Sequence, residues 1–157
     1  LARLYACDWE NAIQTFKYVN TKSNDAAVRH KALVHLLRTF TEMGEYDKAE
    51  EVGAFLEKQK LERETQKNFY LNKAYYFQVR NNYDYMVRSL TQADSLLSRT
   101  DRKGRIYFLI GQVYQQLGFS SLAYNYYRKC LSTNPDYEID FYARLNMAQV
   151  AQLNDSR

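Results

Sequence analysis

The chain has 157 residues and a mass of 18.6 kDa, and 46% of its residues are hydrophobic while 25% are charged. This balance is typical of one soluble domain with a hydrophobic core. Its formal net charge of +4 is too small for a dedicated nucleic-acid binder, and no stretch reaches the roughly 18 apolar residues of a transmembrane helix. Cys7 and Cys130 are far apart and unclustered, so no disulfide or metal framework is predicted.

Helices are predicted throughout, because one proline and five glycines leave too few turn signals for a β fold. Apolar residues recur at intervals of three and four, as in Leu33, Leu36, Leu37 and Phe40, the pattern of an amphipathic helix. Short polar breaks at 43–46, 80–83 and 117–120 favour antiparallel helix hairpins. The expected helices, in chain order, span residues 8–20, 25–43, 46–59, 62–80, 83–98, 101–117, 120–132 and 137–153.

One sequence pattern recurs every 37 residues, in the pairs Trp9/Ala12, Tyr46/Ala49, Tyr83/Met86 and Ser120/Ala123. A period of this size is the signature of a repeat architecture. The predicted fold class is therefore all-α, a right-handed superhelical solenoid of antiparallel helix pairs that forms a single domain over 1–157. Repeats are expected at residues 1–29, 30–66, 67–103 and 104–137, with a partial fifth at 138–157. Because the chain starts abruptly without Met, we expect it to be a fragment of a longer protein.

The unit over 104–137 carries the most complete motif, which reads Tyr107-x₂-Ile110-Gly111-x₂-Tyr114, then Ala123-x₃-Tyr127 and Pro135. It resembles the W-x₂-L-G-x₂-Y, A-x₃-F, P pattern of the tetratricopeptide repeat. Gly111 and Ala123 would let the two helices of a hairpin approach closely, while the tyrosines fill the space beside them. The resemblance implies a solenoid whose concave groove, lined by the first helix of each pair, binds other proteins.

Motifs for catalysis or metal binding are missing from the sequence. His30 and His35 lie five residues apart, on different faces of a helix, and neither has a cysteine or carboxylate at ligand spacing in a known motif. Phosphate-binding loops, dinucleotide-binding loops, nucleophile elbows and zinc-protease motifs do not occur. We therefore expect a protein that is not an enzyme and that takes no cofactor and no metal.

Cys7 ends a Leu4-Tyr-Ala-Cys7 segment that is similar to a lipobox. Arg3 stands where a hydrophobic run should precede such a box, however. The 37-residue period also places Cys7 at the turn position occupied later by Gly44, Asn81 and Gly118. A structural role for Cys7, at a turn, is therefore favoured.

The 37-residue period also selects three rows of residues on the first helices of the pairs. These rows are Val34, Leu71, Phe108 and Leu145; Arg38, Tyr75, Gln112 and Gln149; and Thr41, Gln78, Gln115 and Gln152. An apolar stripe beside neutral glutamines suits an extended or helical peptide from a partner protein. Packing between neighbouring helices is an equally open explanation for the aliphatic row, whereas partner binding is favoured for Tyr75, Gln112 and Gln115. The predicted partners are other proteins and not nucleic acid, and a membrane is involved only through an anchor outside this chain.

Individual polar and charged positions leave two further alternatives open. Asn72 and Arg105 match positions where some family members clamp a chaperone's C-terminal carboxylate, but Val34, Arg38 and Leu109 stand where the other clamp residues would be Lys, Asn and Arg, so this use is not favoured. Arg105 remains a predicted partner-binding residue. The basic run Arg99, Arg102, Lys103 and Arg105 could meet phosphate or an acidic partner. Because Asp94 and Asp101 dilute that run, a solvated loop is the favoured interpretation.

A narrower resemblance covers the last two units, at residues 105–118, 127–138 and 141–148. Its most specific part is Asn134-Pro-x-Tyr-Glu138 followed by Ala143-x₂-Asn146-x-Ala148. These segments resemble the repeat region of the PorW/SprE lipoproteins of Bacteroidota type IX secretion and gliding motility. The resemblance implies a periplasmic scaffold, anchored to the outer membrane, that connects secretion-machine components. The alternative is a sensor or regulatory module of a cytoplasmic signalling protein, which would be coupled to an output domain elsewhere.

Overall fold

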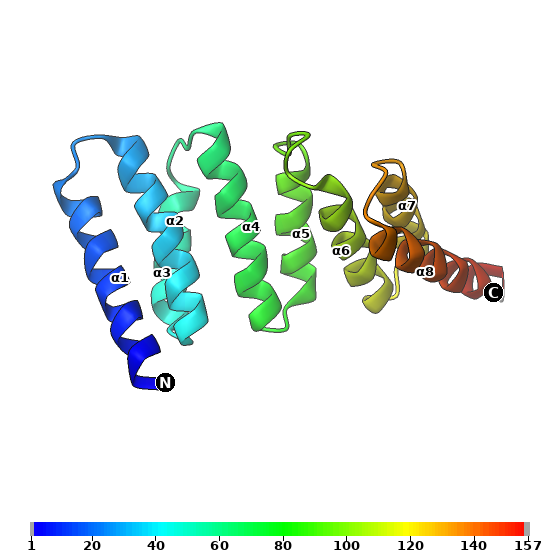
Figure 1. The fold of residues 1–157 in the computed structure, drawn as a ribbon, viewed down its shortest axis with the longest axis horizontal. Helices are drawn as coiled ribbons and strands as arrows, with labels where there is room; N and C mark the ends of the chain where they lie inside the picture. The colour runs from blue at the N-terminus through cyan, green and yellow to red at the C-terminus, as the bar shows by residue number, and fades with distance from the viewer. Residues whose placement is uncertain (1, 156–157) are drawn as a thin grey trace. The chain divides into compact units, whose positions relative to one another are not determined.

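The computed structural model describes residues 2–155 of the chain, with the side chains of residues 9–153 and 155, and over this range it contains α-helices and no strands (Figure 1). The helices are α1 Ala2–Lys22, α2 Ala26–Met43, α3 Tyr46–Glu57, α4 Arg63–Val79, α5 Tyr83–Asp94, α6 Lys103–Gln116, α7 Ser120–Leu131 and α8 Tyr137–Asp155. The predicted all-α class of helical repeats is confirmed. Two compact units, Leu1–Asn82 and Tyr83–Arg157, hold α1–α4 and α5–α8 respectively.

Three helices end in the same way, 37 residues apart. The residues that follow α2, α4 and α6 at Gly44, Asn81 and Gly118 have φ angles of 75°, 55° and 84°. In each case the next N–H donates to a carbonyl five residues back, at 2.9, 2.8 and 2.9 Å. This pattern is the Schellman motif, which needs a residue that tolerates a left-handed backbone. The short breaks predicted at these places are therefore helix ends with a defined hydrogen-bonding geometry.

The first helix departs from the prediction at the equivalent position. A helix was expected from residue 8, after a turn at Cys7, but α1 begins at Ala2 and runs through Cys7 to Lys22. A left-handed backbone is costly for a residue with a Cβ unless it is Asn or Asp, so the 37-residue pattern provides no stop signal at this point. The side chain of Cys7, on which its expected structural role depends, lies outside the described side chains.

Helix α5 ends at Asp94, four residues before the predicted end at 98. The segment that follows satisfies its polar groups locally, because the Ser98 hydroxyl donates to the Asp101 carboxylate at 2.7 Å. Serine and aspartate often compete with helical hydrogen bonding in this way. Leu97 lies beyond the end of α5 but is buried. The apolar pattern therefore continues past the helix, and the predicted helix was too long.

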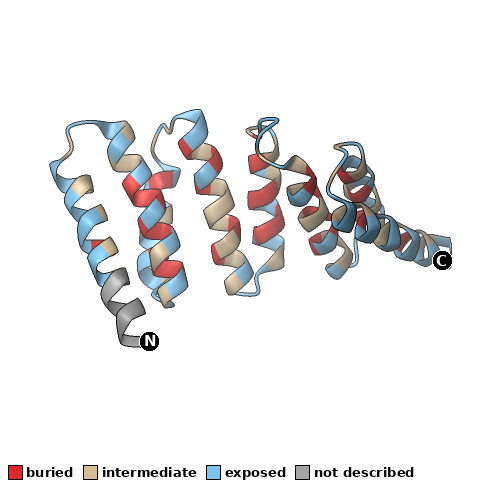
Figure 2. Ribbon diagram, viewed as in Figure 1, coloured by how far each residue is buried: buried red, intermediate tan, exposed pale blue. Residues whose placement is uncertain are grey.

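The core of the first unit is built around α2. Leu36, Leu37 and Phe40 of α2 are buried, and they belong to one cluster with Leu56 of α3 and Phe69 of α4. Figure 2 shows the buried residues running along α2, with exposed residues on the outer faces of the neighbouring helices. The periodicity of three and four residues that predicted the amphipathic helix thus corresponds to this packed stripe.

The core of the second unit centres on Tyr127 of α7, whose side chain is fully buried. A Cβ placed on Gly111 of α6 would lie only 2.7 Å from the Tyr127 ring. The helices can therefore come this close because position 111 has no side chain. The Tyr127 hydroxyl donates to Gln115 Oε1 of α6 at 2.6 Å and accepts from Asn146 Nδ2 of α8 at 3.3 Å. One side chain thereby joins three helices.

Candidate functional site

The predicted partner-binding residues fall on two surfaces, one in each unit. We call the first the α2/α4 surface; it carries Val34, Arg38, Leu71, Tyr75 and Gln78. We call the second the α6/α8 surface; it carries Arg105, Phe108, Gln112, Gln115, Leu145 and Gln149. Each surface belongs to one of the two compact units.

A pocket of about 300 Å³ lies on the α2/α4 surface, and the side chains that line it are mostly polar or cationic: Lys31, Val34, His35, Arg38, Thr65, Asn68 and Asn72. Val34 is only 5% exposed and belongs to the core cluster, so it contributes an apolar wall and little free surface. No carboxylate lines the pocket. Its electrostatics therefore favour an acidic or amide-bearing ligand.

Arg38 and Tyr75 form a preorganised pair on this surface. The guanidinium carbon of Arg38 lies 3.7 Å from the centroid of the Tyr75 ring, and Arg38 Nε donates to Glu42 Oε1 at 2.6 Å. The cation–π contact and the ion pair hold two long side chains in place without full burial. Two residues that the sequence placed in one row are therefore in direct contact across α2 and α4.

Two asparagines and a buried threonine provide the polar groups contributed by α4. Asn72 Nδ2 donates to the backbone oxygen of Asn68 at 2.8 Å, which leaves the Asn72 side-chain oxygen free to accept. Among the described residues, the Thr65 hydroxyl is buried and has no hydrogen-bond partner. A buried polar group without a partner costs stability. Such a group is therefore more easily retained beside a binding pocket than in a closed core.

The α6/α8 surface is organised by Gln115. Its side-chain oxygen accepts the hydrogen bond from Tyr127, and its Nε2 lies 3.5 Å from Gln149 Oε1. Burial raises the pKa of Tyr127 to about 12, against a smaller lowering effect of the hydrogen bond from Asn146. The tyrosine therefore stays neutral and acts as a fixed hydrogen-bond donor to the glutamine.

The other predicted residues of the α6/α8 surface differ in how far their side chains are exposed. Phe108 is half-buried, with its ring centroid 5.8 Å from that of Tyr127. Gln112 and Gln149 are exposed, as is Leu145 at 43%. Arg105 is exposed and lies 3.3 Å from Asp136 Oδ2, away from the glutamines along α6. The surface therefore offers amides and an apolar side chain around a rigid Tyr127–Gln115 pair.

Sequence reasoning missed four residues that line the α2/α4 pocket: Lys31, His35, Thr65 and Asn68. Lys31 and His35 lie one helical turn before Val34 and Arg38, so extending each predicted row by three or four residues would have found them. His35 also stacks on Phe16 of α1, with ring centroids 5.1 Å apart, a contact that no spacing rule reveals. In the described part of the chain, no group of three or more His, Cys, Asp and Glu side chains is arranged to hold a metal ion.

Among the described helices, none combines the length and the apolar character needed to cross a bilayer.

The family model described as tetratricopeptide repeat matches residues 104–137, which cover α6, α7 and the loop that leads into α8. A search of curated proteins finds no match. Tetratricopeptide repeats generally mediate protein–protein interactions, and an all-helical repeat fold of this kind is typically a scaffold without catalytic activity. The chain thus contains a tetratricopeptide repeat at residues 104–137, within an all-helical fold consistent with a tetratricopeptide repeat protein.

Proposed function

We propose that the chain is a protein–protein interaction module that binds an extended segment of a partner protein on the α2/α4 surface. The observation that supports this is the pocket of about 300 Å³ lined by Lys31, Arg38, Asn68 and Asn72 beside the apolar wall of Val34. An extended peptide needs hydrogen-bonding partners for its backbone and pockets for its side chains. Asparagine amides supply the former, and cations beside an apolar wall suit a segment with acidic and aliphatic side chains.

The α6/α8 surface extends the proposal to a second contact region. Gln112 and Gln149 are exposed, and Gln115 is held by Tyr127. A fixed amide loses less conformational entropy on binding than a free one, so preorganisation favours affinity here. Two surfaces that each bind weakly can together give a higher affinity when one partner engages both.

The resemblance of residues 105–148 to the PorW/SprE lipoproteins supports a more specific role, as a scaffold of the type IX secretion and gliding machinery. In that role the chain lies on the periplasmic face of the outer membrane, held by an anchor outside this sequence. The partner is then another component of the secretion machine. This setting rests on the resemblance alone, and the binding surfaces do not depend on it.

The experiment is a capture assay followed by direct binding. The chain, an Asn68→Ala, Asn72→Ala variant and an Asn11→Ala, Asn125→Ala control are immobilised, and captured proteins are identified by mass spectrometry. All four positions are on helices, and three of the four side chains are exposed while Asn72 is half-buried. Circular dichroism verifies that all three proteins fold. The affinity of each identified partner is then measured by calorimetry on purified proteins.

We expect the partner's dissociation constant to rise about tenfold or more in the Asn68, Asn72 variant, as for the loss of one or two good hydrogen bonds, and to stay unchanged in the control. Equal binding by all three proteins would show that the α2/α4 surface is not part of the interface. Capture of secretion-machine components from envelope extract supports the secretion setting. Capture of cytoplasmic signalling proteins alone would instead support the alternative, a regulatory module of a cytoplasmic signalling protein.

A further inference from the structure

A second pocket, of about 400 Å³, lies entirely within the second unit, where the loop before α6 meets the loop before α8. We call it the basic pocket. It is lined by Arg99, Arg102, Lys103, Gly104 and Arg105 from the first loop and the start of α6, and by Thr133, Asn134, Pro135 and Asp136 from the second loop and Ile139 from the start of α8. Its volume lies within the range of small-molecule sites.

The basic pocket has more positive than negative charge. Four of its lining side chains are cationic and one, Asp136, is a carboxylate. Asp136 lies 3.3 Å from Arg105. Among the described residues, the side chains of Arg99, Arg102 and Lys103 have no ion pair. Like charges gathered in a hollow repel one another, and an anion between them would relieve that repulsion.

The two acidic residues that were expected to dilute this charge both accept hydrogen bonds from side chains that do not line the pocket. Asp94 accepts hydrogen bonds from Lys129 at 2.6 Å and from Tyr107 at 2.7 Å. Asp101 accepts from the Ser98 hydroxyl at 2.7 Å. Neither lines the basic pocket. Arg99 and Arg102 are exposed, as expected of a solvated loop, and together with Lys103 they also line the basic pocket.

The backbone adds to the attraction for an anion. Helix α6 starts after Arg102, which has a left-handed φ of 50° and gives the helix no side-chain cap. The first N–H groups of a helix carry partial positive charge and are usually met by the side chain of Ser, Thr, Asp or Asn. At the start of α6 the neighbouring side chains are cations instead of a capping group. The N–H groups of the helix and these side chains therefore both favour a negatively charged ligand.

The pocket is also held in shape by a close approach of its two loops. Gly104 is buried, and a Cβ at this position would lie 2.5 Å from Thr133 Oγ1. Thr133 is itself fixed, since its hydroxyl donates to the Cys130 carbonyl at 2.7 Å. The backbone of the two loops that carry the lining residues is therefore held in a close contact.

We propose that the basic pocket binds a phosphate group, either as free phosphate or as the phosphate of an ester. A phosphate monoester carries about −1.5 to −2 charges near neutral pH, which offsets at least half of the pocket's surplus positive charge. Arginine forks match phosphate oxygens in bidentate fashion, and Arg99 and Arg102 are available for this. The pocket is distinct from the α2/α4 surface and shares only Arg105 with the residues proposed for the α6/α8 surface.

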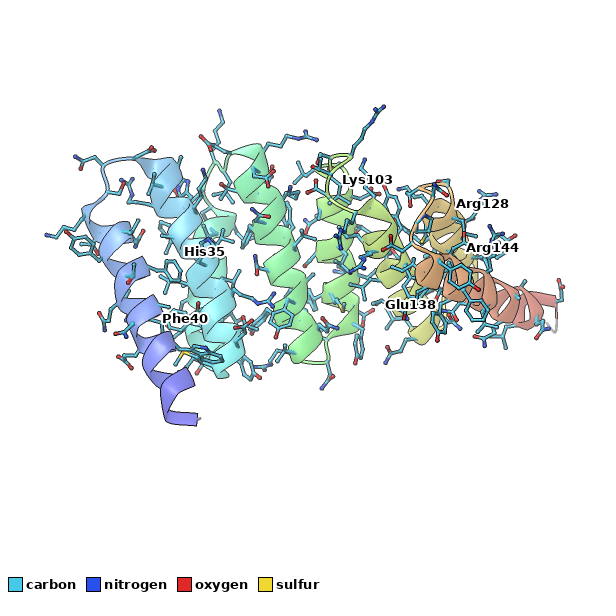
Figure 3. The ribbon with its side chains drawn as sticks, in the orientation of Figure 1. His35, Phe40, Lys103, Arg128, Glu138 and Arg144 are labelled. Carbon is cyan, nitrogen blue, oxygen red and sulfur yellow. The ribbon has the colours of Figure 1, made fainter. Side chains whose placement is uncertain are left out.

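The test is calorimetric titration of the whole chain at low ionic strength, where charge interactions are least screened. Inorganic phosphate and pyrophosphate probe the free anion, O-phosphoserine probes the ester, and serine and sulfate are controls. The pocket variant is Arg102→Gln, Lys103→Gln. Its matched control is Lys60→Gln, Arg128→Gln, which changes the net charge equally at two exposed positions outside the pocket. Figure 3 shows Lys103 at the start of α6 and Arg128 on α7.

We expect saturable binding of at least one phosphate probe to the parent, about tenfold or more weaker binding to the pocket variant, and at most a small change in the control. Arg99→Gln, in an exposed loop, gives a second variant if the first does not fold, and it should weaken binding in the same direction. An equal loss in the pocket and control variants would show only a long-range charge effect and overturn the site. Absence of saturable phosphate binding, or sulfate binding more tightly than every phosphate probe, would also overturn it.

Discussion

Two glycines inside helices allow a stringent test of how α6 and α7 pack. Gly111→Ala introduces a methyl group 2.7 Å from the Tyr127 ring, whereas Gly53→Ala in α3 introduces one with nothing within 4 Å. Both glycines lie within helices and neither has a left-handed backbone. The two substitutions therefore share the same gain in helix propensity and differ in their surroundings.

The magnitudes follow from these distances. Replacing glycine by alanine inside a helix stabilises by about 0.8–1 kcal/mol, which is the expected effect of Gly53→Ala. Ordinary contact begins near 3.4 Å, so the new methyl group at 111 must displace a ring that is fully buried and hydrogen-bonded at its hydroxyl. Overpacking of this kind costs about 1–3 kcal/mol. We expect Gly111→Ala to be less stable than Gly53→Ala by about 1–3 kcal/mol.

The assay is urea unfolding followed by circular dichroism, with thermal melts as a second measurement. For a chain of this length, each kcal/mol corresponds to about 2–4 °C in Tm. A Gly111→Ala protein as stable as Gly53→Ala would refute the close packing of α6 on Tyr127. As a further check, Tyr127→Leu should make Gly111→Ala less costly, because a smaller side chain leaves room for the methyl group and the two effects then couple.

Three further predictions concern Tyr127 and Cys130. Tyr127→Phe leaves Gln115 Oε1 without its donor and should cost about 0.5–1.5 kcal/mol in urea unfolding; no measurable cost would mean that the Gln115 amide finds water instead. Burial raises the pKa of Tyr127 from 10.0 to about 12 and of the Cys130 thiol from 9.0 to about 11. The folded state therefore favours the neutral forms, so its stability should hold below pH 9 and fall as pH rises from about 9 to 12. Urea midpoints across this range test the slope, and a flat profile would contradict the two shifts. In a Cys7→Ser protein, the fully buried Cys130 should react with a thiol reagent only as fast as the chain unfolds, and prompt reaction would show that Cys130 is accessible.

The sequence predicted the helix ends well where a residue that favours a left-handed backbone follows the helix. The hairpin ends at Gly44 and Gly118 were found because glycine at the end of an amphipathic stripe marks a helix C-terminus. The prediction was wrong at Cys7, where the repeat spacing was followed although the residue cannot easily take the left-handed backbone. It was also wrong after Asp94, where hydrogen bonds between Ser98 and Asp101 end the helix before its apolar pattern ends.

The candidate sites could be predicted only in part, for a physical reason. Repeat spacing places Arg38 and Tyr75 in one row, and they do stack. The 37-residue spacing selects one residue per helix for each row, so Lys31, one helical turn before Val34, was missed. The basic pocket was harder still, because its two loops are about 30 residues apart in sequence and meet through the absence of a side chain at Gly104.

The recurring helix ends at Gly44, Asn81 and Gly118 have a consequence for how such a chain can change in length. Each stop signal is local, since its hydrogen bonds join residues within six positions of one another. A duplicated or deleted stretch of 37 residues would therefore carry a complete stop signal with it and leave the remaining ones intact. An insertion of any other length inside a helix would shift its apolar stripe relative to the signal. Gain and loss of whole units is thus the form of variation that this chain tolerates best, and a length change in multiples of 37 is what related sequences should show.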